Sequence, residues 1–461
     1  GEQTQMDYIM LPSSLVGFTN DYTKIVTTTA GTAALLVHGS LKVTEADRTC
    51  SCCGSKMHVH GTTDANLRHV SVGLEPMIVQ FEKVRHYCPN CSQTRMQEVP
   101  FQAKGHRITE QLYNLVRDLL AWGLTLKVVS KFTGLGKNTV KQIDLERLRD
   151  LYTIDGERLI KPERQARVLG IDEFLLHKGH KYATVIIDME TGHILWLAHG
   201  RKKACVYSFI EHVGMEWMAG VEAVACDMNS DFQQAFQDRC PHIDVVFDYF
   251  HIHKNLNDKV VSEVRKDEQR RLLAEGDTEA AKALKGSRYI LFSSRKSLER
   301  KDEEARKAKA EPKEKADNLF KKPQTELRDD HLERYERLLA ENKLFFTIDI
   351  IKELLTQAYQ ATDEDSMRKA IDEIIELCEA TGNKHFLWFK RLLEKHMFGI
   401  ITHATHNISS GKIEGLNHAI KNVRRQGYGY PDDEYFFLKL FDVSRRTYER
   451  NPSALKIPQD L

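Results

Sequence analysis

The chain has 461 residues, of which 29% are charged and 41% hydrophobic, and its formal net charge is +1. This length exceeds what one hydrophobic core supports, so we expect roughly three domains of ordinary soluble composition. The near-neutral charge excludes a uniformly basic or acidic protein. We find no secretory signal and no apolar run of the ~18 residues that span a bilayer, so we expect a cytoplasmic protein.

Short alternating apolar and polar stretches in residues 8–45 predict β-strands. The next segment holds the pairs Cys50-x-x-Cys53 and Cys88-x-x-Cys91. Each pair presents two thiolates from one tight turn, and two pairs complete a tetrahedral site for one structural Zn²⁺. The alternatives are four unrelated buried thiols, or Cys52 as a ligand in place of Cys53. The gap between the pairs exceeds the common ~15–20 residues, which predicts a long loop inside this zinc ribbon.

Helical periodicity begins at Thr109, and lysine and arginine outnumber aspartate and glutamate between residues 101 and 167. Residues 125–149 predict a short helix, a glycine-containing turn and a second helix capped at Asn138 or Thr139, the pattern of a helix-turn-helix. A plain helical hairpin is the alternative. Four valine and isoleucine side chains should join the two helices: Val128, Val129, Val140 and Ile143. Four polar residues near the start of the second helix are candidates for DNA contacts: Lys137, Asn138, Lys141 and Gln142.

Residues 152–166 carry glycine and proline with weak periodicity, which indicates a linker. An α/β pattern follows, with strands in 166–172, 182–188, 193–199, 221–227 and 243–252 and helices over 204–218 and 230–239. From about 256 to 397 the sequence is helical and highly charged. Strand signals do not return, and SGKIEGLNHAIKNVRRQ predicts a helix closed by a GYGYP turn. A helical insertion therefore interrupts an α/β domain.

Two aspartates end predicted strands, Asp172 in VLGID and Asp227 in VEAVACD. Carboxylates at neighbouring strand ends can share divalent cations, which activate a water or a 3′-hydroxyl for phosphoryl transfer. One such aspartate is more often a turn or cap residue. The order of the acids favours a catalytic set, because a strand acid before a hairpin and another after the first helix precede a late helical glutamate.

The chain resembles the ISL3 family of insertion-sequence transposases over about residues 45–445. The matching motifs are CSCCG…YCPNC, the helix-turn-helix, GIDEF, ACDMNSDF, FDYFHIHK and SGKIEGLNHAIKNVRRQGYGY. The resemblance implies an RNase H-like catalytic domain whose catalytic acids are Asp172, Asp227 and Glu414. It also implies two Mg²⁺ (or Mn²⁺) ions per active site, and it makes the helical block an insertion domain.

Glu414 follows the predicted Ser409-Ser410-Gly411 turn and shares a helical face with Asn417 and Lys421. That face offers a metal ligand, an amide and a phosphate partner. Solvated surface positions explain other glutamates, such as Glu376.

Further candidates surround this set. Asp248, His251 and Asn417 could orient the metal ligands, although Asp248 and His251 could equally be structural. Three basic residues on the Glu414 helix could hold DNA phosphates or be solvated charges: Lys421, Arg424 and Arg425. We interpret His403, His406 and His418 as surface residues or DNA-backbone contacts.

We therefore expect a multidomain protein of α+β and α/β class. The expected order is N-terminal strands (1–45), zinc ribbon (46–103), helix-turn-helix domain (104–152), linker (153–166), catalytic domain (167–255), helical insertion (256–397), the rest of the catalytic domain with the Glu414 helix (398–450) and a tail (451–461).

The function implied is binding of the terminal inverted repeats of an insertion sequence, followed by strand cleavage and transfer to target DNA. Double-stranded DNA is the expected partner, and a nucleoid-associated homodimer or larger assembly is expected on it, because two ends must meet. The alternatives are a domesticated DNA-binding regulator without catalysis and an RNase H-like junction resolvase.

Overall fold

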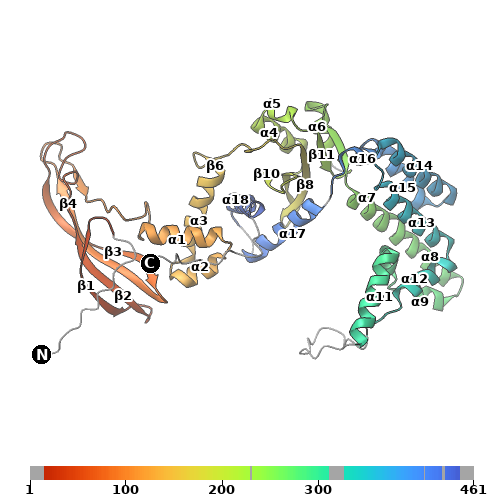
Figure 1. Cartoon of the computed structure of the whole chain (residues 1–461), viewed down its shortest axis with the longest axis horizontal. Helices are drawn as coiled ribbons and strands as arrows, with labels where there is room; N and C mark the ends of the chain where they lie inside the picture. Colours follow the sequence, from red (N-terminus) through yellow and green to blue (C-terminus); the bar gives the residue numbers. More distant parts are fainter. Residues whose placement is uncertain (1–14, 229–230, 311–326, 410, 428–430, 447–461) are drawn as a thin grey trace, which may run out of the picture. The chain divides into compact units, whose positions relative to one another are not determined.

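The computed structural model describes residues 15–228, 231–310, 327–409, 411–427 and 431–446. The predicted tail, Ser410 of the predicted turn, most of the GYGYP turn and the start of the N-terminal strand region lie outside these residues. The chain folds into two compact units, one of residues 1–160 and 422–443 and the other of residues 161–421 and 444–461 (Figure 1). None of the helices in the described part combines the length and the apolar character that crossing a membrane requires.

The first unit begins with a five-stranded sheet of order β1-β2-β4-β3, with β5 paired to β4. Strands β2 and β4 are parallel, and the other pairs are antiparallel. The prediction of a long loop between the cysteine pairs is wrong, because β3 and β4 fill this gap as a hairpin that turns at Gly73 with φ +59°. Alternate residues of β4, such as Val79 and Phe81, are buried, and this period of two accounts for the strand. The strands are β1 (Phe18–Thr27), β2 (Ala33–Leu41), β3 (His58–Val72), β4 (Glu75–Tyr87) and β5 (Thr94–Met96).

Three helices follow, α1 (Glu110–Ala121), α2 (Leu126–Thr133) and α3 (Lys137–Tyr152). The hydroxyls of Thr109 and Thr125 cap α1 and α2. The cap of α3 predicted at Asn138 or Thr139 is wrong, since Gly136 holds that position without a side-chain bond. The chain enters α3 through a tight turn that contains Gly134, whose φ of +71° is a conformation that favours glycine.

The three helices enclose a small core. Val129, Val140 and Ile143 lie in this core as predicted. Val128 does not, because its side chain is exposed. The other buried contributors are Ala103, Ile108, Leu112, Val116, Leu119, Leu120 and Leu135.

A buried polar network joins α3 to α18 (Asp433–Ser444) within the first unit. Arg147 donates to Asp144 on its own helix at 3.0 Å and to Asp442 on α18 at 3.0 Å. The hydroxyl of Tyr435 and the ammonium of Lys439, both on α18, donate to Asp144. The two acids and two cations are largely shielded from water, and their bonds tie the C-terminal helix to a helix that lies nearly 300 residues earlier in the chain. A small hairpin, β6 (Thr153–Ile154) and β7 (Arg158–Leu159), follows α3.

The second unit is built on a five-stranded sheet of order β10-β9-β8-β11-β12. Strands β8 to β10 pair antiparallel, and β8, β11 and β12 run parallel. The predicted α/β pattern is confirmed for all five strands, but two of the predicted ends are wrong. Strand β8 does not end at Asp172, because it continues into the hairpin with β9. The fifth strand, predicted over 243–252, ends at Phe247, because residues 249–252 belong to the helix that follows. The elements are β8 (Val168–His177), β9 (Lys181–Asp188), β10 (Ile194–His199), α4 (Lys203–Val213), α5 (Met215–Ala219), β11 (Ala223–Cys226), α6 (Phe232–Arg239) and β12 (Asp244–Phe247).

After β12 the described residues of this unit form helices only, as the sequence predicts. They are α7 (Tyr249–Asn255), a π-helical turn η1 (Leu256–Val261), α8 (Ser262–Ala274), α9 (Thr278–Leu284), α10 (Arg288–Phe292), α11 (Arg295–Ala310), α12 (His331–Glu341), α13 (Lys343–Ala358), α14 (Glu364–Thr381), α15 (Lys384–Ile401), α16 (His403–His406) and α17 (Gly411–Gln426), whose residues up to Lys421 belong here.

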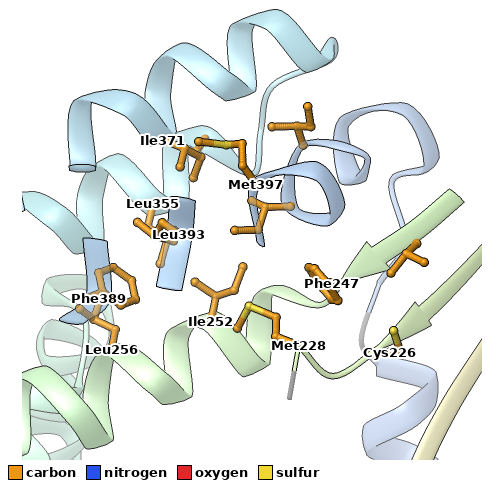
Figure 2. Packing of buried hydrophobic residues seen from close by; sticks show 14 of the residues in the cluster. Cys226, Met228, Phe247, Ile252, Leu256, Leu355, Ile371, Phe389, Leu393 and Met397 are labelled. Carbon is orange, nitrogen blue, oxygen red and sulfur yellow. The ribbon is translucent and has the colours of Figure 1, made fainter. Parts of the chain in front are cut away.

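The helices and the sheet of this unit share one hydrophobic core. Figure 2 shows Phe247 of β12 and Ile252 of α7 beside Leu393 and Met397 of α15. A Cβ added at Gly399 would lie 2.5 Å from the ring of Phe247, so the glycine allows α15 to pack closely on β12. The hydroxyl of Thr402 then donates to the carbonyl of Val245 at 2.7 Å. The insertion therefore returns the chain to the edge strand of the sheet.

The buried network on α3 allows a matched test of stability. Replacing Arg147 with Met should lower the free energy of unfolding by about 3–5 kcal/mol, because it removes the guanidinium that two buried carboxylates share. Arg149 lies on the same helix and pairs with Glu434 of α18 at 3.0 Å, but these side chains are 35% and 54% exposed. Arg149→Met should therefore cost less than about 1 kcal/mol. Urea unfolding followed by circular dichroism measures both, and equal losses would contradict the network's role.

Candidate metal centre and active site

Four cysteines of the first unit form a compact thiol cluster. The sulfur atoms of Cys50, Cys53, Cys88 and Cys91 all lie within 4.8 Å of one another, an arrangement that can hold a metal ion. Cys52 is exposed and lies outside this cluster. The four thiols come from the turn before β3 and the turn between β4 and β5, so the β3–β4 hairpin holds the two pairs together.

The two turns have matching backbones. The N–H of Cys50 donates to the carbonyl of Ser55 at 2.9 Å, and the N–H of Cys88 donates to the carbonyl of Gln93 at 2.8 Å. The residue after the second cysteine of each pair is left-handed, with φ +69° at Gly54 and +55° at Ser92. Serine adopts this conformation less readily than glycine, so tertiary contacts must hold it at Ser92.

Hydrogen bonds within the cluster favour the thiolate form of Cys53 and Cys50. Bonds from Ser55 and then Asn90 lower the pKa of Cys53 to about 5. Backbone N–H groups of Cys53 and Cys52 lower the pKa of Cys50. Thiolates are the form in which cysteine binds metal.

In the second unit, three aspartates lie level at one edge of the sheet. Ala225 of β11 pairs with Gly170 of β8 and with Val246 of β12, so these three residues share one level of the parallel ladder. Two residues beyond each of these stand Asp172 on β8, Asp227 directly after β11 and Asp248 directly after β12. The three aspartates therefore lie at the carboxyl edge of the parallel strands.

Asp172 and Asp227 line a cavity of about 330 Å³ together with Glu173, Arg201 and Asp231. One carboxylate oxygen of Asp172 accepts from the N–H of Glu173 at 2.8 Å. Burial raises the pKa of Glu173, the charge of Arg201 partly offsets this, and the negative charges of Asp172 and Asp227 raise it further. The cavity is therefore an acidic site that favours cations.

Helix α17 contacts this site through an amide. The side chain of Asn417 donates to the second oxygen of Asp172 at 2.9 Å. Glu414 lies three residues earlier on the same helix and is exposed. Burial raises the pKa of Asp248, and the charges of Glu414 and Asp172 raise it as well, so these carboxylates influence one another. Among the described residues, only the four cysteines are as closely spaced as ligands of a bound ion, and the acids surround a wider space.

His251 lies on the first helix after β12, where its Nδ1 is 3.8 Å from a carboxylate oxygen of Asp227. Asp248 begins that helix as its N-terminal cap residue and is buried. Both residues therefore follow the point where β12 ends, and His251 is close to Asp227.

Several basic candidates have protein partners. Lys141 forms an ion pair with Asp432 at 3.2 Å and lies over the ring of Tyr435, whereas Lys137, Asn138 and Gln142 are exposed on α3. Arg424 is half-buried over the ring of Phe436, and burial lowers its pKa. Lys421 and Arg425 are exposed.

The interpretation of two histidines as surface or DNA contacts is wrong. His403 is buried, stacks edge-on against Tyr359 and contacts the carbonyl of Ile408 through its Nε2 at 3.1 Å. The Nε2 of His406 lies 2.8 Å from Asp244, with the imidazole largely covered. His418 is exposed on α17. A local sequence pattern does not distinguish a histidine that packs against a distant element from one that faces solvent. The burial of the His403 and His406 side chains could therefore not be predicted from the sequence.

Three charged residues of the cavity were not predicted from the sequence: Glu173, Arg201 and Asp231. Glu173 was hidden by its neighbour Asp172, although the Asp-Glu pair in GIDEF is itself a signal. Arg201 follows the third strand directly after Gly200, and only the strand order brings it to the edge that holds Asp172.

Comparison with known proteins bears on both sites. A family model for transposases, that of the ISL3 group, matches residues 169–440. The chain belongs to the ISL3 transposase family. A second model, described as the zinc-finger of transposase IS204/IS1001/IS1096/IS1165, matches residues 47–91 and contains the thiol cluster.

Curated relatives agree with this assignment. The transposase for insertion sequence element IS1001 of Bordetella parapertussis is 27% identical over 402 residues, covering 87% of this chain and 89% of the relative. The transposase for insertion sequence element IS1557 of Mycobacterium tuberculosis is 23% identical over 390 residues, covering 83% and 82%. The chain is thus a transposase, an enzyme that acts on DNA.

The thiol cluster predicts which cysteines matter for metal. Cys53→Ser should lower the zinc content from about one ion per chain, because one of four ligands is lost. Cys52→Ser should leave it unchanged, because this neighbouring thiol lies outside the cluster. Elemental analysis of the purified variants measures the ratio. Zinc loss in the Cys52 variant with retention in the Cys53 variant would reverse the ligand assignment.

Proposed function

We propose that this transposase binds the terminal inverted repeats of its insertion sequence and catalyses metal-dependent strand cleavage and strand transfer with Asp172, Asp227 and Glu414. The observation that carries the proposal is the meeting of two strand ends and a late helix at one acidic edge. Asp172 and Asp227 leave the sheet at the same level, and the Asn417 bond holds α17, the helix of Glu414, against Asp172.

An RNase H-like fold for the catalytic domain rests on the strand order. Three antiparallel strands are followed by two parallel strands on the far side of the first, with helices between the later strands. In such a sheet the carboxyl ends of the parallel strands provide a common edge for ligands. The helical insertion separates Asp227 from Glu414 in sequence while packing on the edge strand β12.

Carboxylate oxygens suit Mg²⁺ or Mn²⁺, and two such ions at Asp172, Asp227 and Glu414 would activate the attacking hydroxyl and stabilise the leaving oxygen. The chain's own residues orient these ligands. Asn417 and the N–H of Glu173 each hold one oxygen of Asp172, which fixes the carboxylate plane. His251 lies 3.8 Å from Asp227, and buried Asp248 feels the charges of Glu414 and Asp172, so both are proposed as positioning residues.

Recognition of double-stranded DNA is assigned to the first unit. Helices α2 and α3, with the glycine-containing turn between them, support a helix-turn-helix whose second helix exposes Lys137, Asn138 and Gln142. Lys421 and Arg425 are proposed phosphate contacts on α17. Because two element ends must be joined to one target, the active species is proposed to be a homodimer or larger assembly.

The proposal that Glu414 is the third catalytic acid can be tested by substitution, because its side chain is exposed. Glu414→Gln should retain end binding and reduce cleavage and strand transfer by on the order of 10³-fold, because a metal ligand contributes several kcal/mol to the transition state. Glu376→Gln is the matched control, since Glu376 is also an exposed helical glutamate, on α14. Strand transfer of a pre-cut end in Mg²⁺ measures the effect. Normal activity in the Glu414 variant with loss in the Glu376 variant would refute the assignment.

The DNA-binding helix is tested by comparing three positions. Lys137→Ala should weaken binding to all sequences and lower the salt slope by about 1. Lys141→Ala should change the slope less, because Asp432 already neutralises this ammonium. Gln142→Ala should relax base discrimination by about 1–3 kcal/mol.

Binding of end and scrambled oligonucleotides across a salt series measures these quantities, with Arg158→Ala as the control. Parent-like binding by both the Lys137 and Gln142 variants would show that α3 does not read the DNA.

A further inference from the structure

Arg201 occupies an unusual position in the acidic cavity. It follows β10, and it is the one cation among the described residues that line the cavity, beside Asp172, Asp227, Glu173 and Asp231. A phosphodiester is an anion, so it meets repulsion from these carboxylates unless cations accompany it. Arg201 is the cation that the chain itself supplies there.

The backbone of Gly200, the residue before Arg201, is held by hydrogen bonds at both its N–H and its carbonyl. The N–H of Gly200 donates to the carbonyl of Tyr182 at 2.7 Å, and the buried hydroxyl of Thr184 donates to the carbonyl of Gly200 at 2.7 Å. Gly200 has φ +95°, a conformation that favours glycine. The guanidinium carbon of Arg201 lies 4.6 Å from the centroid of the Tyr182 ring, which supports the side chain from one face.

The other contact of the guanidinium is weak. Its Nη1 lies 3.9 Å from the carboxylate of Glu173, and the two side chains are 57% and 37% exposed. Exposed pairs of this kind contribute about 0–1 kcal/mol. The guanidinium can therefore exchange this carboxylate for another anion at little cost, while Gly200 and Tyr182 keep it at the cavity.

We propose that Arg201 binds the phosphodiester on which Asp172, Asp227 and Glu414 act, exchanging Glu173 for a non-bridging phosphate oxygen. The inference rests on the proposed function, because it assumes that the cavity holds the scissile phosphate. In the reaction the attacking oxygen bonds to phosphorus as the bond from phosphorus to the 3′-oxygen breaks. The nucleophile's proton leaves to solvent, the leaving oxygen gains a proton, and Arg201 stays protonated throughout. The guanidinium can direct more than one of its N–H donors at the phosphate group, whose charge it would offset in the transition state.

The test uses the full-length protein on end DNA in Mg²⁺, with Lys202→Ala as the control, because Lys202 is the exposed neighbouring cation and does not line the cavity. Arg201→Ala should lower the rate of cleavage by about 10²-fold with end binding unchanged. Arg201→Lys should recover part of that loss, since it keeps the charge and loses the paired donors. Lys202→Ala should cut like the parent.

A neutral methylphosphonate at the scissile position separates phosphate binding from a structural role. Removing the phosphate charge removes what Arg201 offsets, so the difference between parent and Arg201→Ala should shrink on this substrate. An undiminished difference, a parent-like rate for Arg201→Ala, or an equal loss of end binding would overturn the inference. If Arg201→Ala does not fold, the cleavage rates of parent and Arg201→Lys on the two substrates are compared instead, with the same outcomes supporting or overturning the inference. A parent that neither cleaves nor transfers strands in Mg²⁺ would instead refute the proposed function.

Discussion

The parallel ladder of β8, β11 and β12 is the constraint on which the catalytic unit depends. It aligns Gly170, Ala225 and Val246. Asp172, Asp227 and Asp248 each lie two residues further along the chain, so all three are found at one edge of the sheet. Carboxylates gathered in this way repel one another. Burial is the main reason why the pKa values of Asp248 and Glu173 are raised, and the neighbouring carboxylates add to it. Cations bound at this edge would therefore reduce the repulsion between its carboxylates. The same property suits it to metal-dependent chemistry on a phosphate.

The return of the chain after the insertion follows from packing on β12. Because Gly399 has no side chain, the ring of Phe247 can pack directly against α15. The hydrogen bond from the hydroxyl of Thr402 to the carbonyl of Val245 then holds the end of α15 at β12. From there the chain leads into α17, whose Asn417 contacts Asp172. The insertion therefore acts as a packed part of the catalytic unit, since its buried residues continue the core of the sheet (Figure 2). The first unit uses a different device, the buried charges of Asp144, Arg147 and Asp442.

Local patterns in the sequence predicted what local physics determines. Apolar runs ending in Asp172 and Asp227 gave the strands of the catalytic sheet, and the spacing of four cysteines gave the thiol cluster. The extension of β8 past Asp172 was missed because its pairing with β9 depends on a hairpin partner. Long-range contacts had no local signal, as with the Arg147 network, the burial of His403 and the position of Arg201 at the cavity. Glu414, the proposed third acid, was predicted from family resemblance and from the face of its helix, because nearly two hundred residues separate it from Asp227.

We propose that α17 brings Glu414 to cations that Asp172 and Asp227 would hold. Anomalous diffraction from crystals of the protein with end DNA and Mn²⁺ is the sharpest test. We expect manganese peaks at the carboxyl edge of β8 and β11, with an oxygen of Glu414 at a bonding distance of about 2.0–2.2 Å, close to that of the similarly small Mg²⁺. Manganese bound by Asp172 and Asp227 with Glu414 left in solvent, or bound elsewhere in the unit, would contradict it.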